Sequence, residues 1–258
     1  MSIICRYFFT VRSIHIFFSF LLLLLPINTS FADQIRIAVA SNFTNTLRAI
    51  VKKFELASNH KVVVISGSTG KHYAQIINGA PFDVFLAADS RRPSLLEEKR
   101  IALPSSRFTY AVGKIVLWSP TITMDKVNEN TLNTIGSAHL AMANARLAPY
   151  GFAAKEVLVN LNLWKKLQKN IIRGENINQA FQFVYSKNAK YGLVSLAQIR
   201  NFKEIKKSSY WEVPQSLYTK IEQQAVILNN TIASKEFMLF LKSDDILRLI
   251  ENAGYHTY

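Results

Sequence analysis

The feature that most constrains the fold is a strand–turn–helix unit that occurs three times in succession. In its second copy, a β-branched run at residues 61–65 passes through Ser-Gly-Ser-Thr-Gly at residues 66–70 into an apolar helical pattern. Units of the same order span residues 35–54 and 83–99. Successive strand–helix units imply a parallel sheet that is covered by helices on both faces. We therefore predict an α/β protein.

The remainder of the chain indicates a second lobe of the same kind. Residues 108–118 form a β-prone run that, at about 3.3 Å per residue, is long enough to leave one lobe and enter another. Further strand–helix units follow, and the expected return crossing lies between Val213 and Gln224. The predicted segments are a leader at residues 1–32, a first lobe of residues 33–115 and 219–258, and a second lobe of residues 116–218.

The first 32 residues are typical of a secretory signal peptide. Two arginines precede an apolar run at residues 16–25, Pro26 follows the run, and Ser-Phe-Ala at residues 30–32 supplies small residues for a cleavage site. The apolar run is shorter than the ~20 residues that span a bilayer. We expect cleavage before Asp33 and a periplasmic mature protein.

The composition argues against several chemistries. The single cysteine, Cys5, lies within the leader, so residues 33–258 hold no thiol for a disulfide, a metal or a nucleophile. Of the 31 Lys and Arg, 29 follow the leader and give, with 17 Asp and Glu, a net charge of +12. These cations are scattered, without the aromatic interleaving that is typical of nucleic-acid sites. Because no His lies in a triad-like motif, we also predict no enzyme activity.

Small and hydroxyl-bearing residues lie where the predicted strands give way to helices. In open parallel sheets, ligands bind beyond the carboxyl ends of the strands, next to helix N-termini. Turns of this kind include these positions: Ser41, Ser68, Thr69, Tyr150, Ile177 and Ser195. Hydroxyls and backbone amides donate hydrogen bonds, so the expected ligand is an oxyanion that needs only donors. Ser and Thr are also ordinary helix N-caps, which leaves a purely structural role open.

The absence of acids from these turns narrows the charge state of the ligand. No acidic residue interrupts residues 40–42 or 67–69, whereas a protonated anion such as hydrogen phosphate would need an acceptor. A fully deprotonated tetrahedral dianion fits better. Glu175 is the exception, although an acid in the first turn of a helix has an ordinary dipole role. Neither a P-loop nor a nucleophile elbow is present around residues 66–71.

Longer motifs carry a family resemblance. They are AVASN at residues 38–42, GSTG at 67–70, GAPFDVFLAAD at 79–89, RFTYAVGK at 107–114, LAPYG at 147–151 and QAV at 224–226. In this order they resemble the periplasmic molybdate-binding proteins of bacterial ABC importers, over essentially the whole chain after the leader.

The resemblance implies a type II periplasmic binding protein fold, in which two doubly wound lobes joined by two crossover strands close on one molybdate or tungstate. It implies a monomeric binding protein with no resident cofactor that works with an ABC permease in the inner membrane. The metal enters only as the oxyanion, without direct protein coordination. Carried over by motif, the ligands are the hydroxyls of Ser41, Ser68, Thr69 and Ser195 and the backbone amides of Tyr150 and Ile177.

Two positions depart from the family pattern. Thr69 stands where the family usually has a second serine, and its methyl group is expected to tighten the cavity. Ser195 stands where some members have a tyrosine, so a role as a helix N-cap stays open beside a role as a ligand. Lys71 and His72, in the first turn of the predicted helix, are expected to face water.

Three other functions stay open from the sequence. Sulfate or thiosulfate would be satisfied by the same donors as molybdate. A ferric site is suggested only by Tyr73 and Tyr150, without a nearby set of His and carboxylate ligands. A secreted hydrolase would require a nucleophile paired with a base, for which the sequence contains no motif. The choice between molybdate and tungstate is not decided.

Overall fold

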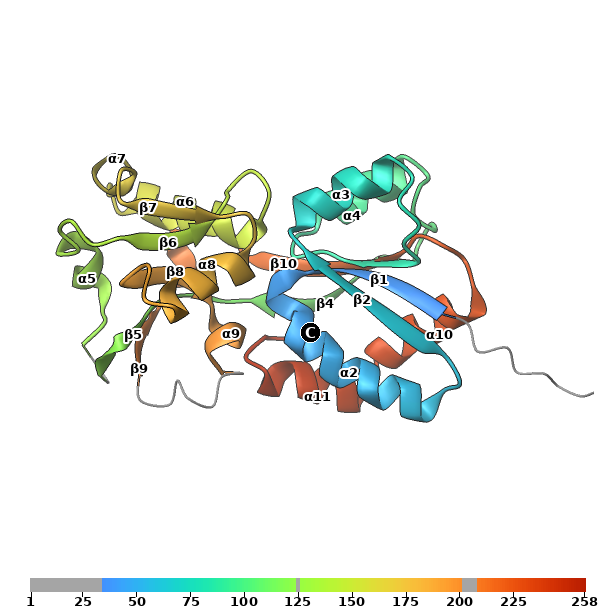
Figure 1. The fold of residues 1–258 in the computed structure, drawn as a ribbon. Helices are drawn as coiled ribbons and strands as arrows, with labels where there is room; N and C mark the ends of the chain where they lie inside the picture. The colour runs from blue at the N-terminus through green and yellow to red at the C-terminus, as the bar shows by residue number, and fades with distance from the viewer. Residues whose placement is uncertain (1–33, 124–125, 201–207) are drawn as a thin grey trace, which may run out of the picture. The chain divides into compact units, whose positions relative to one another are not determined.

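A computed structural model describes residues 34–123, 126–200 and 208–258 (Figure 1). All of them belong to one unit, Asp33–Tyr258. The predicted signal peptide at residues 1–32 lies outside the described residues. Within the described ranges, no helix has the length and apolar character that crossing a membrane requires.

The first sheet has five strands in the order β2-β1-β3-β10-β4. The strands are β1 (Gln34–Ala40), β2 (Lys61–Gly67), β3 (Val84–Leu86), β4 (Phe108–Gly113) and β10 (Ile221–Ile227). β1 pairs in parallel with β2 and β3, as the repeated strand–helix units predict. β10 runs antiparallel to both β3 and β4.

Helices cover both faces of the first sheet, and we call this sheet with its helices the first lobe. The helical elements are η1 (Ser41–Phe43), α2 (Thr44–Ala57), α3 (Thr69–Ile77), α4 (Arg91–Glu98), α10 (Ile232–Leu241) and α11 (Asp244–Asn252). Alternate residues of β1 supply the two cores: Ile37 packs in the cluster with Leu47 and Phe237, and Ala38 packs in the cluster with Ile76 and Leu96. Figure 1 accordingly shows α3 and α4 on one side of the sheet and α2, α10 and α11 on the other.

The second sheet repeats this plan in the order β7-β6-β8-β5-β9. Its strands are β5 (Ile115–Thr123), β6 (Leu140–Ala143), β7 (Ile171–Gly174), β8 (Tyr191–Ser195) and β9 (Ser208–Glu212). β6 is parallel to β7 and β8, whereas β5 is antiparallel to β8 and β9.

We call the second sheet with its helices the second lobe. The helices are α5 (Glu129–Asn133), α6 (Pro149–Asn160), α7 (Trp164–Leu167), α8 (Ile177–Tyr185) and α9 (Leu196–Arg200), and η3 (Gln215–Leu217) follows β9. Leu117 packs in the cluster on the α6 side, whereas Trp118 packs on the α8 side and stacks on Phe181 with ring centroids 4.9 Å apart. Neighbouring residues of one strand thus serve opposite cores, as expected for a strand that is covered on both faces.

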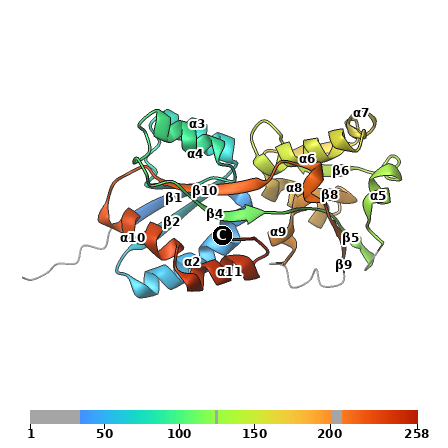
Figure 2. The same ribbon diagram turned by 180° about the vertical axis from the view of Figure 1, so that it is seen from behind.

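The chain passes between the lobes at the two predicted crossings. β4 ends at Gly113 and β5 begins at Ile115, so Lys114 alone separates a strand of the first sheet from a strand of the second (Figure 2). The return passage lies between the end of β9 and the start of β10 at Ile221, inside the predicted interval. The predicted α/β architecture, two doubly wound lobes joined by two crossovers, is confirmed.

The parallel pairing predicted from the strand–helix units is confirmed for β1, β2 and β3, whereas the strands that cross between the lobes run the other way. β5 and β10 each enter a lobe from the other lobe, at the carboxyl edge of the parallel strands, and therefore run against them. Both sheets are mixed for this reason.

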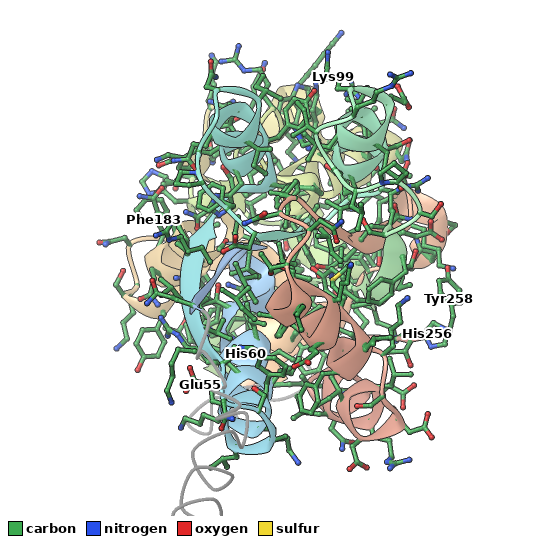
Figure 3. The ribbon with its side chains drawn as sticks, turned by 90° about the vertical axis from the view of Figure 1, so that its right-hand side faces the viewer. Glu55, His60, Lys99, Phe183, His256 and Tyr258 are labelled. Atoms are coloured by element: carbon green, nitrogen blue, oxygen red, sulfur yellow. The ribbon has the colours of Figure 1, made fainter. Side chains whose placement is uncertain are left out.

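The C-terminal residues lie against the first lobe beside the crossing. The His256 and Val112 backbones exchange two hydrogen bonds, with N···O distances of 2.7 and 3.0 Å. Figure 3 shows the side chains of His256 and Tyr258 next to each other at this end of the chain, and their ring centroids are 5.8 Å apart. This bridge covers the outer edge of β4 just before the crossing.

We expect the second-lobe core to tolerate truncation poorly. Leu117→Ala, at a fully buried position of β5, should lower the free energy of unfolding by about 2–5 kcal/mol because it removes packed atoms and leaves a cavity. Leu239→Ala is the matched control, since Leu239 is 69% exposed and its loss should change stability by less than about 0.5 kcal/mol. Urea unfolding followed by circular dichroism measures both, and equal losses would contradict the assigned core.

Candidate functional site

Three helix N-termini meet where the two lobes face each other. α3 begins at Thr69 after β2, α6 begins at Pro149 after β6, and α8 begins at Ile177 after β7. The first-turn amides of a helix have no intrahelical acceptor, and the helix dipole makes this end positive. Such an end attracts anions, and three of them on one site reinforce each other.

A small cavity lies between these N-termini. Its volume is about 10 Å³, which is room for roughly one water-sized particle. The residues that line it are Ala40, Ser41, Asn42, Gly67, Ser68, Thr69 and Ala88 from the first lobe and Ala148, Pro149, Tyr150 and Ile177 from the second. None of these described residues has a charged side chain, so the cavity suits a small ligand that is bound by neutral groups.

Five of the six predicted ligand residues line this cavity. All five are nearly inaccessible to solvent: Ser41, Ser68, Thr69, Tyr150 and Ile177. Strands and helices far apart in the sequence bring them together, as the rule for the carboxyl edges of α/β sheets predicts.

Ser195 lies beside this group and does not line the cavity. It is fully buried at the end of β8, and its hydroxyl donates to the hydroxyl of Tyr150 over 3.2 Å. Its backbone N–H donates to Oε1 of Gln198 over 3.3 Å. The Ser195 hydroxyl therefore contacts a residue of the lining without lining the cavity itself.

The hydroxyl of Ser68 is buried and has no partner. Ser68 occupies the N-cap of α3, but its side chain makes no capping hydrogen bond, and its Oγ contacts no other polar atom. A buried hydroxyl without a partner costs about 1–3 kcal/mol. An acceptor in the cavity would recover that cost, so the geometry points to a ligand rather than to a cap.

The other two hydroxyls of the first lobe are held as acceptors by the backbone. Oγ1 of Thr69 accepts from the N–H of Ala88 over 3.1 Å, and Oγ of Ser41 accepts from the N–H of Asn178 over 3.3 Å. Each hydroxyl group keeps its own hydrogen for donation. With Ser68 they give the described lining of the cavity three hydroxyl donors and no charged side chain, beside one partnerless acceptor, Oδ1 of Asn42.

Polar contacts between the lobes surround the cavity. The N–H of Gly70 donates to the carbonyl oxygen of Leu147 over 2.8 Å, and Nζ of Lys71 lies 2.9 Å from Oε1 of Glu175. The Lys71 and Glu175 side chains are both about half exposed, so water screens the pair and its contribution is small. Glu175, the acid that the sequence places in a predicted turn, thus pairs with a lysine, and neither residue lines the cavity. These contacts describe lobes that are closed on one another.

The prediction that His72 faces water is wrong. His72 is 2% exposed, with Nε2 at 3.2 Å from the carbonyl oxygen of Val39 and Nδ1 at 3.1 Å from Oε1 of Gln75. The first turn of α3 packs onto β1, so this side chain points inward and its ring meets those of Phe82 and Phe85. Burial lowers the pKa of His72, and the neighbouring charge of Lys71 lowers it further.

Asn42 is a lining residue that the sequence analysis did not single out as a ligand. It is 3% exposed, and its Nδ2 donates to Oε1 of Gln223 over 2.8 Å and to the hydroxyl of Tyr255 over 3.1 Å. The available signal was its place directly after Ser41 in the same strand-to-helix turn. Ala88, in the turn after β3, could be found by the same rule.

The residues suggested for ferric binding are not gathered. Tyr73 packs in the apolar cluster with Phe85 and Leu96, whereas Tyr150 lies at the start of α6. In the described ranges, no group of three or more His, Cys, Asp or Glu residues could hold a metal ion.

Comparison with known proteins gives one family and close relatives. The model of the family described as bacterial extracellular solute-binding protein matches residues 35–256. The molybdate-binding protein ModA of Azotobacter vinelandii is 40% identical over 227 residues, which are 87% of this chain and 90% of the relative. The molybdate-binding protein ModA of Rhodobacter capsulatus is 40% identical over 231 residues, 88% of this chain and 89% of the relative.

A solved structure has the same fold. The periplasmic molybdate-binding protein of Azotobacter vinelandii matches with a TM-score of 0.81 and 38% sequence identity, over 87% of this chain and 99% of the other. The agreement extends over both lobes, because the matched share includes nearly all of the described residues.

We expect acid to destabilise the fold through His72. Because its pKa is lowered from the usual 6.5, the unfolded chain binds this proton more readily than the folded protein does. The contribution to stability is complete above about pH 6.5 and is lost as the pH falls below it. His72→Gln should flatten the decline of the unfolding free energy between about pH 7 and 5. Urea titrations across this range would refute the assignment if the variant kept the wild-type slope.

Proposed function

Because this chain belongs to the bacterial extracellular solute-binding proteins, we propose that it captures molybdate between its two lobes and delivers it to an ABC importer. Relatives that are 40% identical over nearly the whole chain carry the name molybdate-binding protein, which supports this choice of solute. A permease in the inner membrane is the partner that such a role requires.

The observation that carries the proposal is the partnerless hydroxyl of Ser68. It belongs to a residue that lines a cavity of about 10 Å³, and no side chain in the described lining carries a charge. The lining also holds one partnerless acceptor, Oδ1 of Asn42. The uncharged lining with its hydroxyl donors favours an oxyanion over a cation. Tungstate, which has the same charge and tetrahedral shape, is expected to bind as well.

The proposed ligands follow from the lining. Oxygen atoms of the ion would accept from the hydroxyls of Ser41, Ser68 and Thr69 and from the backbone amides of Tyr150 and Ile177. For Ser195 we propose a supporting role, because its hydroxyl contacts Tyr150 and not the cavity. The metal would then have no direct bond to a protein atom.

The cellular setting belongs to the same proposal. We propose a cleaved signal at residues 1–32, a periplasmic monomer without enzyme activity, and lobes of residues 33–115 with 219–258 and of residues 116–218. The relatives are solute-binding proteins by name, which supports a transport role over catalysis.

A thermal-shift panel tests the solute. At 100 times its dissociation constant, a ligand stabilises the native state by ~2.7 kcal/mol. This corresponds to a rise of about 5–10 °C in the melting temperature of a protein of this size. We expect that rise with molybdate and tungstate and no change with phosphate or chloride. A larger rise with sulfate or thiosulfate would contradict the assignment to molybdate.

The Ser68→Ala variant tests whether the Ser68 hydroxyl binds the ligand or caps α3. Losing a donor to a charged ligand should cost about 1.5–3 kcal/mol, or roughly 10- to 150-fold in affinity by calorimetry. The unfolding free energy without ligand should not fall, because the Ser68 hydroxyl makes no internal hydrogen bond.

Thr231→Ala is the reverse control for Ser68→Ala. Thr231 caps α10 by accepting from the N–H of Ser234 over 3.0 Å, far from the cavity. Its loss should lower stability by about 1 kcal/mol and leave affinity unchanged. If Ser68→Ala behaved like Thr231→Ala, the hydroxyl would be a cap and the proposed site would be wrong.

A further inference from the structure

A buried chain of hydrogen bonds connects the lobes beneath the cavity. The Tyr150 hydroxyl, from the second lobe, accepts from Oγ of Ser195 over 3.2 Å and from Nε2 of Gln223 over 3.5 Å. Gln223 lies on β10 of the first lobe and is fully buried. Its Oε1 accepts in turn from Nδ2 of Asn42 and from the hydroxyl of Tyr110. One phenol group therefore links α6 to the strand that carries the chain back into the first lobe.

Gly113 makes room for that phenol. A Cβ atom at Gly113 would lie 2.0 Å from the Tyr150 hydroxyl oxygen, 2.8 Å from its Cζ and 3.0 Å from Nε2 of Gln223. The backbone of Gly113 is not in the left-handed region, so its lack of a side chain serves space rather than conformation. Gly113 is also the last residue of β4, immediately before the crossing.

Tyr150 thus touches both the cavity and the joint between the lobes. It lines the cavity in the first turn of α6, and its hydroxyl lies against Gly113 and Gln223 in the first lobe. The lobes turn about the joint, so atoms far from the joint move further than atoms close to it. Adding the width of one methyl group to a contact near the joint would therefore separate the far edges of the lobes by a larger distance.

We propose that the Tyr150 phenol, seated against Gly113 and Gln223, is the stop that sets how far the lobes close. Tyr150 is then a positioning residue through its side chain, and the final volume of the cavity depends on a contact outside it. This inference rests on the proposed function, since closure on an oxyanion is what the stop would limit. The seat is uncharged, because burial keeps the phenol groups of Tyr150 and Tyr110 in their neutral form by raising the pKa of each.

Gly113→Ala should hold the lobes apart. Its methyl group meets the hydroxyl of Tyr150, which two hydrogen bonds hold in place, so closure ends early. We expect the affinity for molybdate to fall on the order of 10- to 100-fold, the usual effect of overfilling a packed contact. Small-angle scattering with saturating molybdate should give a larger radius of gyration than for the wild type.

Gly192→Ala is the matched control. A Cβ atom there would meet Cγ2 of Val184 at 2.5 Å, a clash of similar kind that lies wholly within the second lobe. This variant should lose stability but keep the wild-type affinity and scattering curve. Equal losses of affinity in both glycine variants would overturn the stop, because strain in general would then explain them.

Tyr150→Phe tests the same contact from the other side. It keeps the backbone amide and the ring but removes the oxygen, so affinity should fall only roughly 2- to 10-fold, through faster dissociation. Thr231→Ala is its control, since the hydrogen bond from the Ser234 N–H to the Thr231 hydroxyl lies at the start of α10 within the first lobe. In Thr231→Ala we expect lower stability with an unchanged dissociation rate.

The double variant tests whether the two substitutions act through one contact or independently. In the Tyr150→Phe background, Gly113→Ala should cost less affinity than in the wild type, because the 2.0 Å contact with the oxygen is gone and only the contacts with Cζ at 2.8 Å and with Nε2 of Gln223 at 3.0 Å remain. Additive losses would overturn the stop. A wild-type chain that binds no molybdate at all would instead overturn the proposed function. If Gly113→Ala does not fold, the dissociation rate and scattering of Tyr150→Phe still decide the question, and wild-type values there count against the stop.

Discussion

The structure depends on hydrogen-bond donors that are buried without a counter-charge. Three helices begin at one cavity, and Ser41, Ser68 and Thr69 lie in its lining. A buried donor without a partner, such as the Ser68 hydroxyl, is costly unless an acceptor arrives. Both sheets contribute to the cavity, because the carboxyl ends of the parallel strands in each lobe face the other lobe. The fold thus brings the partial positive charges of three helix N-termini to a site whose described lining holds no charged side chain.

Much of this arrangement could be predicted from the sequence, because most strands and helices of the fold have clear local sequence patterns. β-branched runs followed by Ser, Gly or Pro and then by a helical period located nearly every strand and helix, as at residues 61–77. The carboxyl-edge rule then gathered Ser68 and Tyr150, which lie far apart in the chain. What local patterns could not give was strand direction at the crossings. That direction depends on how the chain travels between lobes.

The errors at single residues have a common physical cause. His72 looked like a solvent-facing residue in a first turn, but tertiary packing of α3 on β1 buried it against two phenylalanine rings. Ser195 was expected to be either a ligand or a helix N-cap; its hydroxyl donates to the hydroxyl of Tyr150, and its role toward the ligand stays a prediction. Asn42 entered the site through a contact with Gln223, on a strand that is distant in sequence. In each case the environment of the residue depends on a neighbour that is distant in the sequence, so a short stretch of sequence could not predict it.

The brevity of the joint at Lys114 has a consequence for signalling. With a single residue between β4 and β5, the lobes have almost no freedom to slide past one another, and what remains to them is a turn about the joint. A bound ion would be buried and inaccessible to any partner protein. Its presence would nevertheless change the angle between the two lobes, and that angle is exposed on the outer surface. Under the proposed function, an importer could recognise a loaded carrier by that angle alone, without ever touching its cargo.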